Sequence, residues 1–344
     1  MKSTFLARRQ ALRTVAASLA APAIAACGGG SSSSAFAQSV PAGVSEAVAA
    51  YAKMEPQTSS ALVRVEAPTG TWSAGHNPDA KLFVGSAVKT FILAQFLRDV
   101  ESARNGLTTT APCDISDLYR TPGASVFGSL SGTSNYRNVL EAMIAHSDNM
   151  ATDIALAKAE PARVRALIAQ AGLTRTQIPE STRRLFSYLA GAPLGVDLGW
   201  PGMVRLANND SQGFTPRTDA INANESMLSS ATDLVSWYQQ VLAGKFFQKP
   251  ATTREFKRIS SMADALWVAV PDDVVGYGKG GSIDWEGFHA LCLAGQMRTR
   301  DVPVSFCFTL NWSGGGSDSM TRVGEFGTAV AAVLSQVNAS VRGG

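Results

Sequence analysis

The sequence predicts a mixed α/β fold of the α+β type: an antiparallel sheet built from the N- and C-terminal segments, flanked by helices, with an inserted all-α lobe. Two patterns lead to this expectation. Strand-like alternation occurs before residue 80 and returns only after residue 265, whereas the segments in between have helical periodicity. In addition, the 344 residues are 45% apolar and 17% charged, so the chain can bury a large core.

The N-terminal part of the body predicts a helix, a strand pair and a buried helix. Apolar residues recur at helical spacing over residues 43–55. Residues 61–67 alternate in polarity, a Pro-Thr-Gly turn follows, and residues 71–74 can return as the partner strand. Residues 83–97 are almost wholly apolar in their second half and predict a buried helix.

The middle of the chain predicts helices and the last third predicts strands. Helical periodicity is present over residues 138–145, 150–159, 162–172 and 231–242, the last after the capping candidates Ser229 and Ser230. Strand-like runs cover residues 266–270, 275–279, 288–294 and 304–311, and a closing helix is expected near 320–337. Residues 184–224, rich in Gly, Pro, Asn and Asp, predict a long loop or insertion.

The N-terminus predicts an export signal. Residues 1–26 contain four Lys and Arg and no acid, and their apolar stretch is shorter than the roughly 20 residues that a membrane-spanning helix needs. Arg8-Arg9 resembles a twin-arginine export motif, and Ile-Ala-Ala-Cys, ending at Cys27, resembles a lipoprotein box. Cleavage after Ala37 is the alternative. We expect an exported, periplasmic protein held at the membrane by a lipid on Cys27.

These patterns divide the chain into three parts. Residues 1–26 are the expected signal and residues 27–42 a flexible tether. The remaining body comprises residues 43–340, of which 43–91 and 265–340 form the α/β part and 92–264 the helical part.

Charge and metal-ligand spacing exclude two classes of function. The formal charge of +3 comes from the leader, and the nearly neutral body lacks Lys/Arg runs, which argues against a nucleic-acid binder. Four cysteines without a Cys-x-x-Cys pair and three histidines without ligand spacing predict no metal and no cofactor.

The C-terminal strands bring two cysteines together. A hairpin centred on residues 298–301 would place Cys292 near Cys307. Export makes a disulfide possible, and two buried free thiols are an equal alternative, because a bridge also needs the right face and register.

Three short motifs carry chemistry, the first at the start of the buried helix. In Ser86-Ala87-Val88-Lys89 the first and last residues share one helix face, so the lysine amine can reach the serine hydroxyl. A hydroxyl needs a base before it attacks a carbonyl, and a lysine desolvated among apolar residues can act as one.

The second and third motifs supply polar groups for a substrate. Ser147-Asp148-Asn149 follows Ser86 by 61 residues and offers a second hydroxyl and a carboxamide, with Asp148 as a structural cap. Lys279-Gly280-Gly281-Ser282 ends an apolar strand, where the glycines let a substrate approach the backbone and the lysine adds positive charge.

In this order and at these intervals, the motifs resemble the serine β-lactamase and penicillin-binding protein superfamily, whose signature is Ser-x-x-Lys, Ser-Asp-Asn and Lys-Thr-Gly. The first interval is similar to that of the class A β-lactamases. The resemblance extends over about residues 43–340 and implies a β-lactamase/transpeptidase-like fold.

The resemblance implies a role for each motif residue. Ser86 would be the acylated nucleophile, Lys89 its base or proton relay, and Ser147 the donor of a proton to the leaving nitrogen. The site would bind substrate through Asn149, which holds an amide, through Lys279, which attracts a carboxylate, and through the strand residues Gly281 and Ser282. The backbone N–H groups of Ser86 and Ser282 would form the oxyanion hole, and Tyr119 would be an aromatic wall.

Two positions depart from the family pattern. Gly280 replaces the threonine whose hydroxyl helps to bind a carboxylate. Class A enzymes also carry Glu-x-x-x-Asn in a later loop, where the glutamate activates the deacylating water. Here Glu180 lies near that place and is the candidate base, but Arg184 stands where the asparagine should be.

The sequence therefore predicts a cofactor-free serine hydrolase, a monomer that acts on a small-molecule β-lactam, peptide or ester. The first expectation is a class A-like β-lactamase. The alternatives are a related esterase or amidase, a D,D-peptidase-like enzyme with little β-lactam turnover, and a binding lipoprotein with a decayed site.

Overall fold

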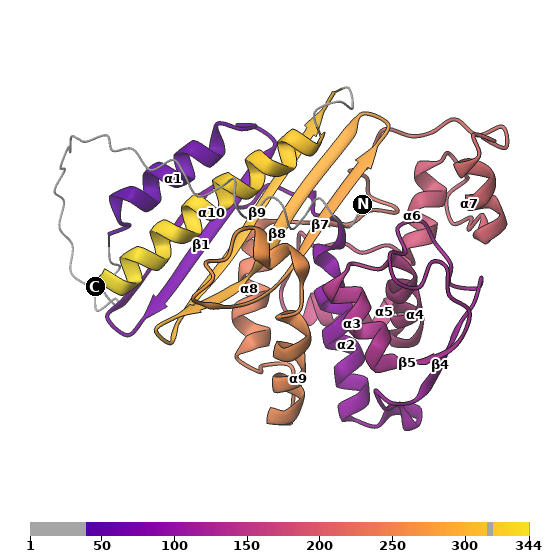
Figure 1. Cartoon of the computed structure of the whole chain (residues 1–344), viewed down its shortest axis with the longest axis horizontal. Helices are drawn as coiled ribbons and strands as arrows, with labels where there is room; N and C mark the ends of the chain where they lie inside the picture. The colour runs from indigo at the N-terminus through magenta and orange to yellow at the C-terminus, as the bar shows by residue number, and fades with distance from the viewer. Residues whose placement is uncertain (1–38, 315–318, 344) are drawn as a thin grey trace. The chain divides into compact units, whose positions relative to one another are not determined.

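The computed structural model describes residues 39–314 and 319–343 (Figure 1). The expected export signal, Cys27 and most of the tether lie outside these residues. In the part that is described, no helix is both long and apolar enough to cross a membrane.

A five-stranded antiparallel sheet joins the two ends of the chain. Its strand order is β2-β1-β9-β8-β7, and its members are β1 (Ser59–Ala67), β2 (Gly70–His76), β7 (Val275–Trp285), β8 (Phe288–Thr299) and β9 (Val302–Ser313). The central pairing is between β1 and β9, where Val63 lies opposite Phe306. The predicted fold class, with a sheet assembled from both ends of the chain, is thus confirmed.

Helices cover the sheet. The terminal helices α1 (Ala42–Ala52) and α10 (Ser319–Gly343) pack on each other and cross the sheet together (Figure 1). The Tyr51 ring of α1 lies 5.3 Å from Phe308, and its hydroxyl donates to the Thr309 carbonyl at 2.8 Å. Helix α8 (Ala231–Leu242) also packs on β1, β8 and β9, although we expected its residues in the helical part. Nine of the twelve residues of β8 and eight of the twelve residues of β9 are consequently buried.

The helical lobe is built around α2 (Lys89–Glu101), which continues from the 3-10 helix η2 (Gly85–Val88). Ten of its thirteen residues are buried, which explains its apolar sequence. The surrounding helices are α3 (Tyr136–Ala145), α4 (Asn149–Ala159), α5 (Pro161–Gln170) and α9 (Pro250–Ser260). Trp237 of α8 donates to Thr90 Oγ1 at 3.0 Å, so this buried contact ties the lobe to the helix on the sheet.

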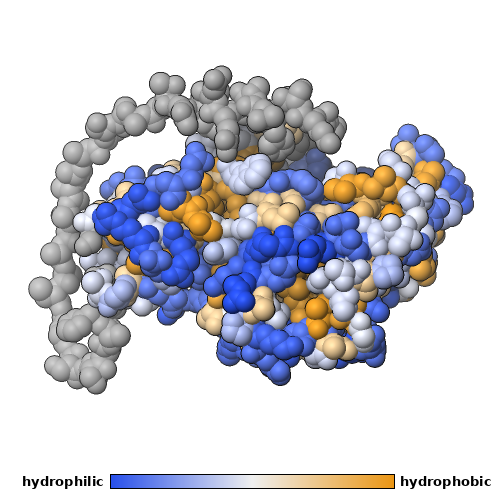
Figure 2. Space-filling view, turned by 60° about the horizontal axis from the view of Figure 1, so that its bottom comes forward, coloured by the Kyte–Doolittle hydropathy of each residue, from blue (hydrophilic) through white to orange (hydrophobic). Residues whose placement is uncertain are grey.

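Short elements complete the described part. The two-residue strands β3 (Leu82–Phe83) and β6 (Leu228–Ser229) pair with each other, as do β4 (Pro112–Ile115) and β5 (Gly132–Asn135). A further 3-10 turn, η3, covers Arg104–Gly106. On the face shown in Figure 2, hydrophilic residues predominate and hydrophobic residues form separate areas.

Three sequence expectations were wrong in detail. The run 266–270 is not a strand: residues Asp264–Val268 form the 3-10 helix η4, because a short apolar run is compatible with either structure. The stretch 184–224 is not only loop, since it contains most of α6 (Thr182–Leu189) and all of α7 (Gly199–Ala207). Lys279 does not end its strand, because β7 continues to Trp285.

The C-terminal hairpin has the expected turn, with Arg300 and Asp301 at positive φ. Its register pairs Cys292 with Thr309 and Cys307 with Ala294, so the cysteines are diagonal neighbours. Both are buried free thiols that contact the Thr309 hydroxyl. Of the two alternatives, the structure therefore has the free thiols.

Candidate active site

Ser86 lies on η2, where this short helix presses against β7. Gly85 begins η2 with φ of 53°, and a Cβ there would come within 2.8 Å of the Ser282 nitrogen. A Cβ at Gly281 would overlap the Val84 carbonyl and lie 2.7 Å from the Ser86 nitrogen. Both positions therefore require glycine. The close approach packs η2, which carries the Ser86 N–H, against β7, which carries the Ser282 N–H, and these two groups are the expected oxyanion donors.

Lys89 connects the first motif to the second. Its side chain is fully buried, and its Nζ donates to the Ser147 carbonyl at 2.7 Å, to Ser147 Oγ at 3.3 Å and to Asn149 Oδ1 at 2.8 Å. Burial lowers the pKa of Lys89 well below its ordinary value, and the positive charge of Lys279 lowers it further. A lysine in this setting is a competent proton acceptor.

The second motif is the turn between α3 and α4, and Ser147 adopts φ of 58° there. Asp148 is the structural cap that its position predicts, since its carboxylate accepts from the backbone nitrogens of Ala151 at 2.7 Å, Val126 at 2.6 Å and Phe127 at 2.9 Å. These bonds fix the preceding loop against the turn. The strained serine is thereby held beside Lys89.

Asn149 is oriented by two partners. Its Nδ2 donates to the Pro122 carbonyl at 2.7 Å, while its Oδ1 accepts from Lys89. The loop that contacts the second motif therefore consists of Pro122 and its successors. Tyr119, the expected aromatic wall, packs partly buried against the core. Among the described residues no hydrogen bond or ring contact joins Tyr119 to Ser86, Lys89 or Ser147.

Lys279 places a second buried ammonium group in the site. It is 3% exposed, and its Nζ donates to the Gly280 carbonyl at 2.9 Å. Burial lowers its pKa to about 7, although the negative charge of Asp264 opposes this shift. Lys279 is thus partly neutral near pH 7, and its charge responds to small changes in the surroundings.

The helix η4 forms a wall that the sequence did not predict. A Cβ at Gly280 would overlap the Ala265 methyl group, so the position where the family has threonine has no room for a side chain. Asp264, at the start of η4, pairs with His146 Nδ1 at 2.8 Å. The pair joins His146, the neighbour of Ser147, to Asp264, the neighbour of the Ala265 that faces Gly280. The short apolar run at residues 266–270 did not indicate this 3-10 helix or its contacts.

Glu180 forms an ion pair with an arginine outside the three motifs. Its carboxylate pairs with Arg165 of α5 at 2.6 Å, and the two side chains are about 40% exposed. Arg184, at the place expected for asparagine, pairs with the buried Glu225. This placement does not support the expected role of Glu180 in activating water.

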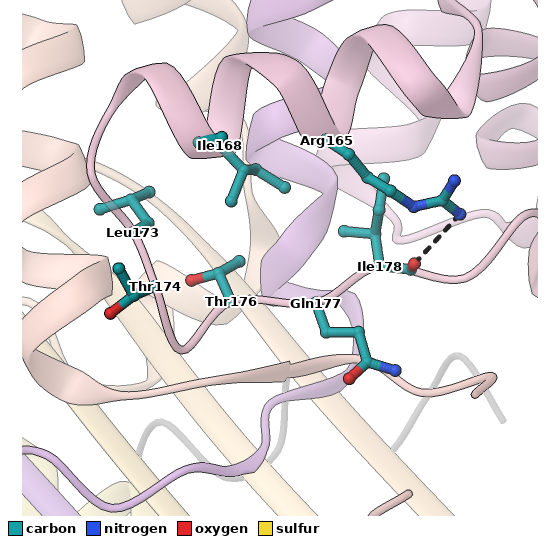
Figure 3. Close-up of a pocket in the computed structure, with 8 residues that line it drawn as sticks. Arg165, Ile168, Leu173, Thr174, Thr176, Gln177 and Ile178 are labelled. Atoms are coloured by element: carbon teal, nitrogen blue, oxygen red, sulfur yellow. Dashed lines mark hydrogen bonds between the residues drawn. The ribbon is translucent and has the colours of Figure 1, made fainter. Parts of the chain in front are cut away.

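Arg165 also borders a cavity outside the three motifs. The cavity has a volume of about 340 Å³ and lies between α5 and residues 173–178 (Figure 3). Its wall includes Ile168, Leu173 and Ile178, and Arg165 donates to the Ile178 carbonyl at 3.4 Å. No motif residue lines it.

The residue nearest the second motif in this region is Thr182, which the sequence did not single out. Its hydroxyl lies 3.4 Å from the Asn149 carbonyl and donates to Asp153 Oδ1 at 2.6 Å. Asp153 is four residues after Asn149, and this one-turn spacing could have identified it. Within residues 39–314 and 319–343, no three His, Cys, Asp or Glu side chains gather in a way that could hold a metal ion.

Comparisons with known proteins agree with this arrangement. The model of the beta-lactamase enzyme family matches residues 43–291. No curated protein matches the chain by sequence. All identities to the solved structures below are under 20%, so these structures show the fold alone.

Three solved structures illustrate the likeness. A beta lactamase from Xanthomonas campestris has a TM-score of 0.64 and 17% identity, covering 86% of this chain and 98% of that one. A class A beta-lactamase from Mycobacterium abscessus has a TM-score of 0.63 and 14% identity, and the match covers 86% of this chain and 99% of that one. A point mutant of PBP-A, described as an acyl-enzyme complex with penicillin G, has a TM-score of 0.60 and 15% identity. The match covers 85% of this chain and 96% of that one.

The family match covers most of the chain and includes all three motifs that meet around Ser86. The chain therefore belongs to the beta-lactamase enzyme family.

Proposed function

We propose that the chain is a class A-like serine β-lactamase (EC 3.5.2.6) that opens β-lactam or related amide bonds through an acyl-Ser86 intermediate and needs no cofactor. The observation that carries this proposal is the position of Lys89 Nζ. It is buried, its pKa is lowered, and it donates to both Ser147 and Asn149 one helical turn after Ser86.

Acylation follows from these contacts. Neutral Lys89 accepts the Ser86 hydroxyl proton, and Oγ forms a bond to the substrate carbonyl carbon. The N–H groups of Ser86 and Ser282 stabilise the oxyanion. The carbon–nitrogen bond then breaks, and the leaving nitrogen takes a proton from Ser147. Lys89 returns a proton to Ser147 across their 3.3 Å contact.

Substrate binding uses the remaining motif residues. Asn149, whose carboxamide is oriented by the Pro122 carbonyl and Lys89, would hold a substrate amide, and Lys279 supplies positive charge while it is protonated. Gly281 lets η2 pack directly against β7, because a side chain there would overlap the Val84 carbonyl, and it thereby places Ser86 beside the strand that a substrate would contact. Tyr119 stays a proposal as an aromatic contact.

A second candidate function is an esterase, an amidase or a D,D-peptidase-like enzyme with little β-lactam turnover. Two observations favour it. Glu180 is paired with Arg165, so deacylation lacks its expected base, and Ala265 fills the place of the hydroxyl that would bind a carboxylate. Both functions use the same acyl-Ser86 step.

The experiment that tests the proposal is the intact mass of the full-length protein over time after penicillin G is added. Penicillin G is the first probe because one structural neighbour is described as an acyl-enzyme with it. We expect an adduct of one penicillin mass that is absent from Ser86→Ala, together with hydrolysed penicillin released as the adduct decays. An unmodified wild-type protein and no product would overturn the β-lactamase proposal.

We also propose that the protein is exported and anchored through a lipid on Cys27. The proposal is supported by the Ile-Ala-Ala-Cys box and the Gly/Ser tract that follows it. The mass of the mature protein from membranes tests it. A chain that begins at residue 38 without lipid would contradict it.

A further inference from the structure

A buried carboxylate lies one helical turn beyond the Ser147-Asp148-Asn149 motif. Asp153 is on α4, and it is 5% exposed. Its Oδ1 accepts from the Thr182 nitrogen at 2.7 Å and from Thr182 Oγ1 at 2.6 Å, and its Oδ2 accepts from the Arg183 nitrogen at 3.1 Å. Three donors at the N-terminus of α6 thus hold one carboxylate, which fastens α6 to α4.

These contacts extend to the base. The Thr182 hydroxyl also lies 3.4 Å from the Asn149 carbonyl, and Asn149 Oδ1 accepts from Lys89 Nζ at 2.8 Å. The Thr182 hydroxyl donates its one proton to Asp153 and lies against the Asn149 backbone, so Asp153 positions the residue that packs on the Lys89 partner Asn149. A change at Asp153 therefore acts on the placement of Thr182 beside Asn149 and on the buried charge near Lys89.

Asp153 is one of the charged groups that act on Lys89. Lys89 and Lys279 are both buried, and the positive charge of Lys279 destabilises the protonated form of Lys89. The negative charges of Asp148 and Asp153 raise the pKa of Lys89 and so oppose its burial and Lys279. Asp148 is already committed to three backbone nitrogens as the cap of α4 and the anchor of its loop.

Asp153 can also lose its charge. Burial raises its pKa to about 6, against the hydrogen bonds from Thr182 and Arg183 and the positive charge of Arg183, which lower it. Above that pH the carboxylate is ionised and supports the protonated form of Lys89.

We infer that Asp153 is a positioning residue, which holds α6 against α4 and supplies the buried negative charge that sets the protonation of the base Lys89. The inference rests on the proposed function, because it concerns the base of the acyl-Ser86 step. It adds a residue outside the three motifs to the acylation machinery.

The test is the pH dependence of Ser86 acylation by penicillin G, measured on the full-length protein. Acylation requires neutral Lys89, so its rate rises with pH through the pKa of that group. Asp153→Asn removes a charge that raises this pKa. The rising limb should therefore move to lower pH, by roughly 0.5 to 1 pH unit.

A matched control separates this effect from damage to the lobe. Asp99 is a carboxylate of α2 that is 1% exposed and bonded to Arg163 and Gln95, and it is not among the charges that act on Lys89. Asp99→Asn should leave the limb in place even where it lowers stability. A merely structural Asp153 would change the rate or the melting temperature without moving the limb.

A second variant covers the case in which Asp153→Asn does not fold. Thr182→Val removes the hydroxyl that lowers the pKa of Asp153, so the carboxylate stays protonated to higher pH. We expect a smaller limb shift in the same direction. Acylation on Ser86 with an unshifted limb in each folded variant would overturn the inference alone, whereas wild-type protein that forms no adduct would overturn the proposed function.

Discussion

The surroundings of Ser86 and the segment 177–184 differ in the partners of their polar side chains. Around Ser86, the three motifs converge through short contacts, with Lys89 Nζ within 3.3 Å of Ser147 and Asn149 and the backbone of η2 against β7. In residues 177–184, by contrast, Glu180 pairs with Arg165 at the border of another cavity. Under the proposed function, the residues proposed for acylation contact one another, whereas the candidate base for hydrolysis of the acyl-enzyme is paired elsewhere. We therefore expect acylation to be faster than deacylation.

The largest expected effect is at the nucleophile. Ser86→Ala removes the hydroxyl oxygen that is proposed to form the ester, so the adduct with penicillin G should disappear, as measured by intact mass. An adduct that persists at the wild-type rate would show that another residue is acylated.

The next largest effect is at the base. Lys89→Met keeps the buried volume but removes the proton acceptor, and we expect acylation to slow by about 10²–10⁴-fold, the range typical of general base catalysis. Stopped-flow or quenched mass measurements give this rate. An acylation rate within a few-fold of wild type would show that Lys89 is not the base, and the contrast between the two regions would then be lost.

A smaller effect is expected from the second lysine. Lys279 lowers the pKa of Lys89, so Lys279→Gln should raise that pKa and move the rising limb of acylation to higher pH, by roughly one unit. This direction is opposite to that of Asp153→Asn. The pH–rate profile checks the sign, and a shift to lower pH would contradict the proposed charge balance.

The smallest effect is expected at Glu180. Because its carboxylate pairs with Arg165 and both side chains are well exposed, Glu180→Gln should change the free energy of unfolding by less than about 1 kcal/mol. It should leave the rate of deacylation unchanged. Arg165→Gln, which breaks the same pair from the other side, is the matched control. A large loss of turnover in Glu180→Gln alone would place a deacylating base in this region.

Much of the fold could be predicted from local patterns. The buried helix after Ser86 and the strands of the sheet have strong periodicity, because each buries one or both faces in a core. The run at 266–270 could not be assigned, since five apolar residues fit either a strand or a turn of helix, and only the packing of Ala265 on Gly280 decides. The Gly- and Asn-rich stretch hid α6 and α7 because its composition favours loops.

Some residues of the candidate site could likewise be predicted from the sequence, and others could not. Ser86, Lys89 and Ser147 are short-range signals with a known order, so their convergence could be expected from the sequence. The partners of Glu180, Asp153 and Asp264 come from segments far apart in the chain. Contacts of this kind depend on tertiary packing, and residue type alone does not determine whether a carboxylate faces a substrate, an arginine or a helix N-terminus.

The most direct test of the account is the lifetime of the penicillin G adduct on the full-length protein, followed by intact mass after excess ligand is removed. We predict an adduct on Ser86 that forms faster than it is lost and that then releases hydrolysed penicillin slowly, because Lys89 serves acylation while Glu180 is paired with Arg165. An adduct that vanishes as fast as it forms, with steady product release that Glu180→Gln abolishes, would contradict the account.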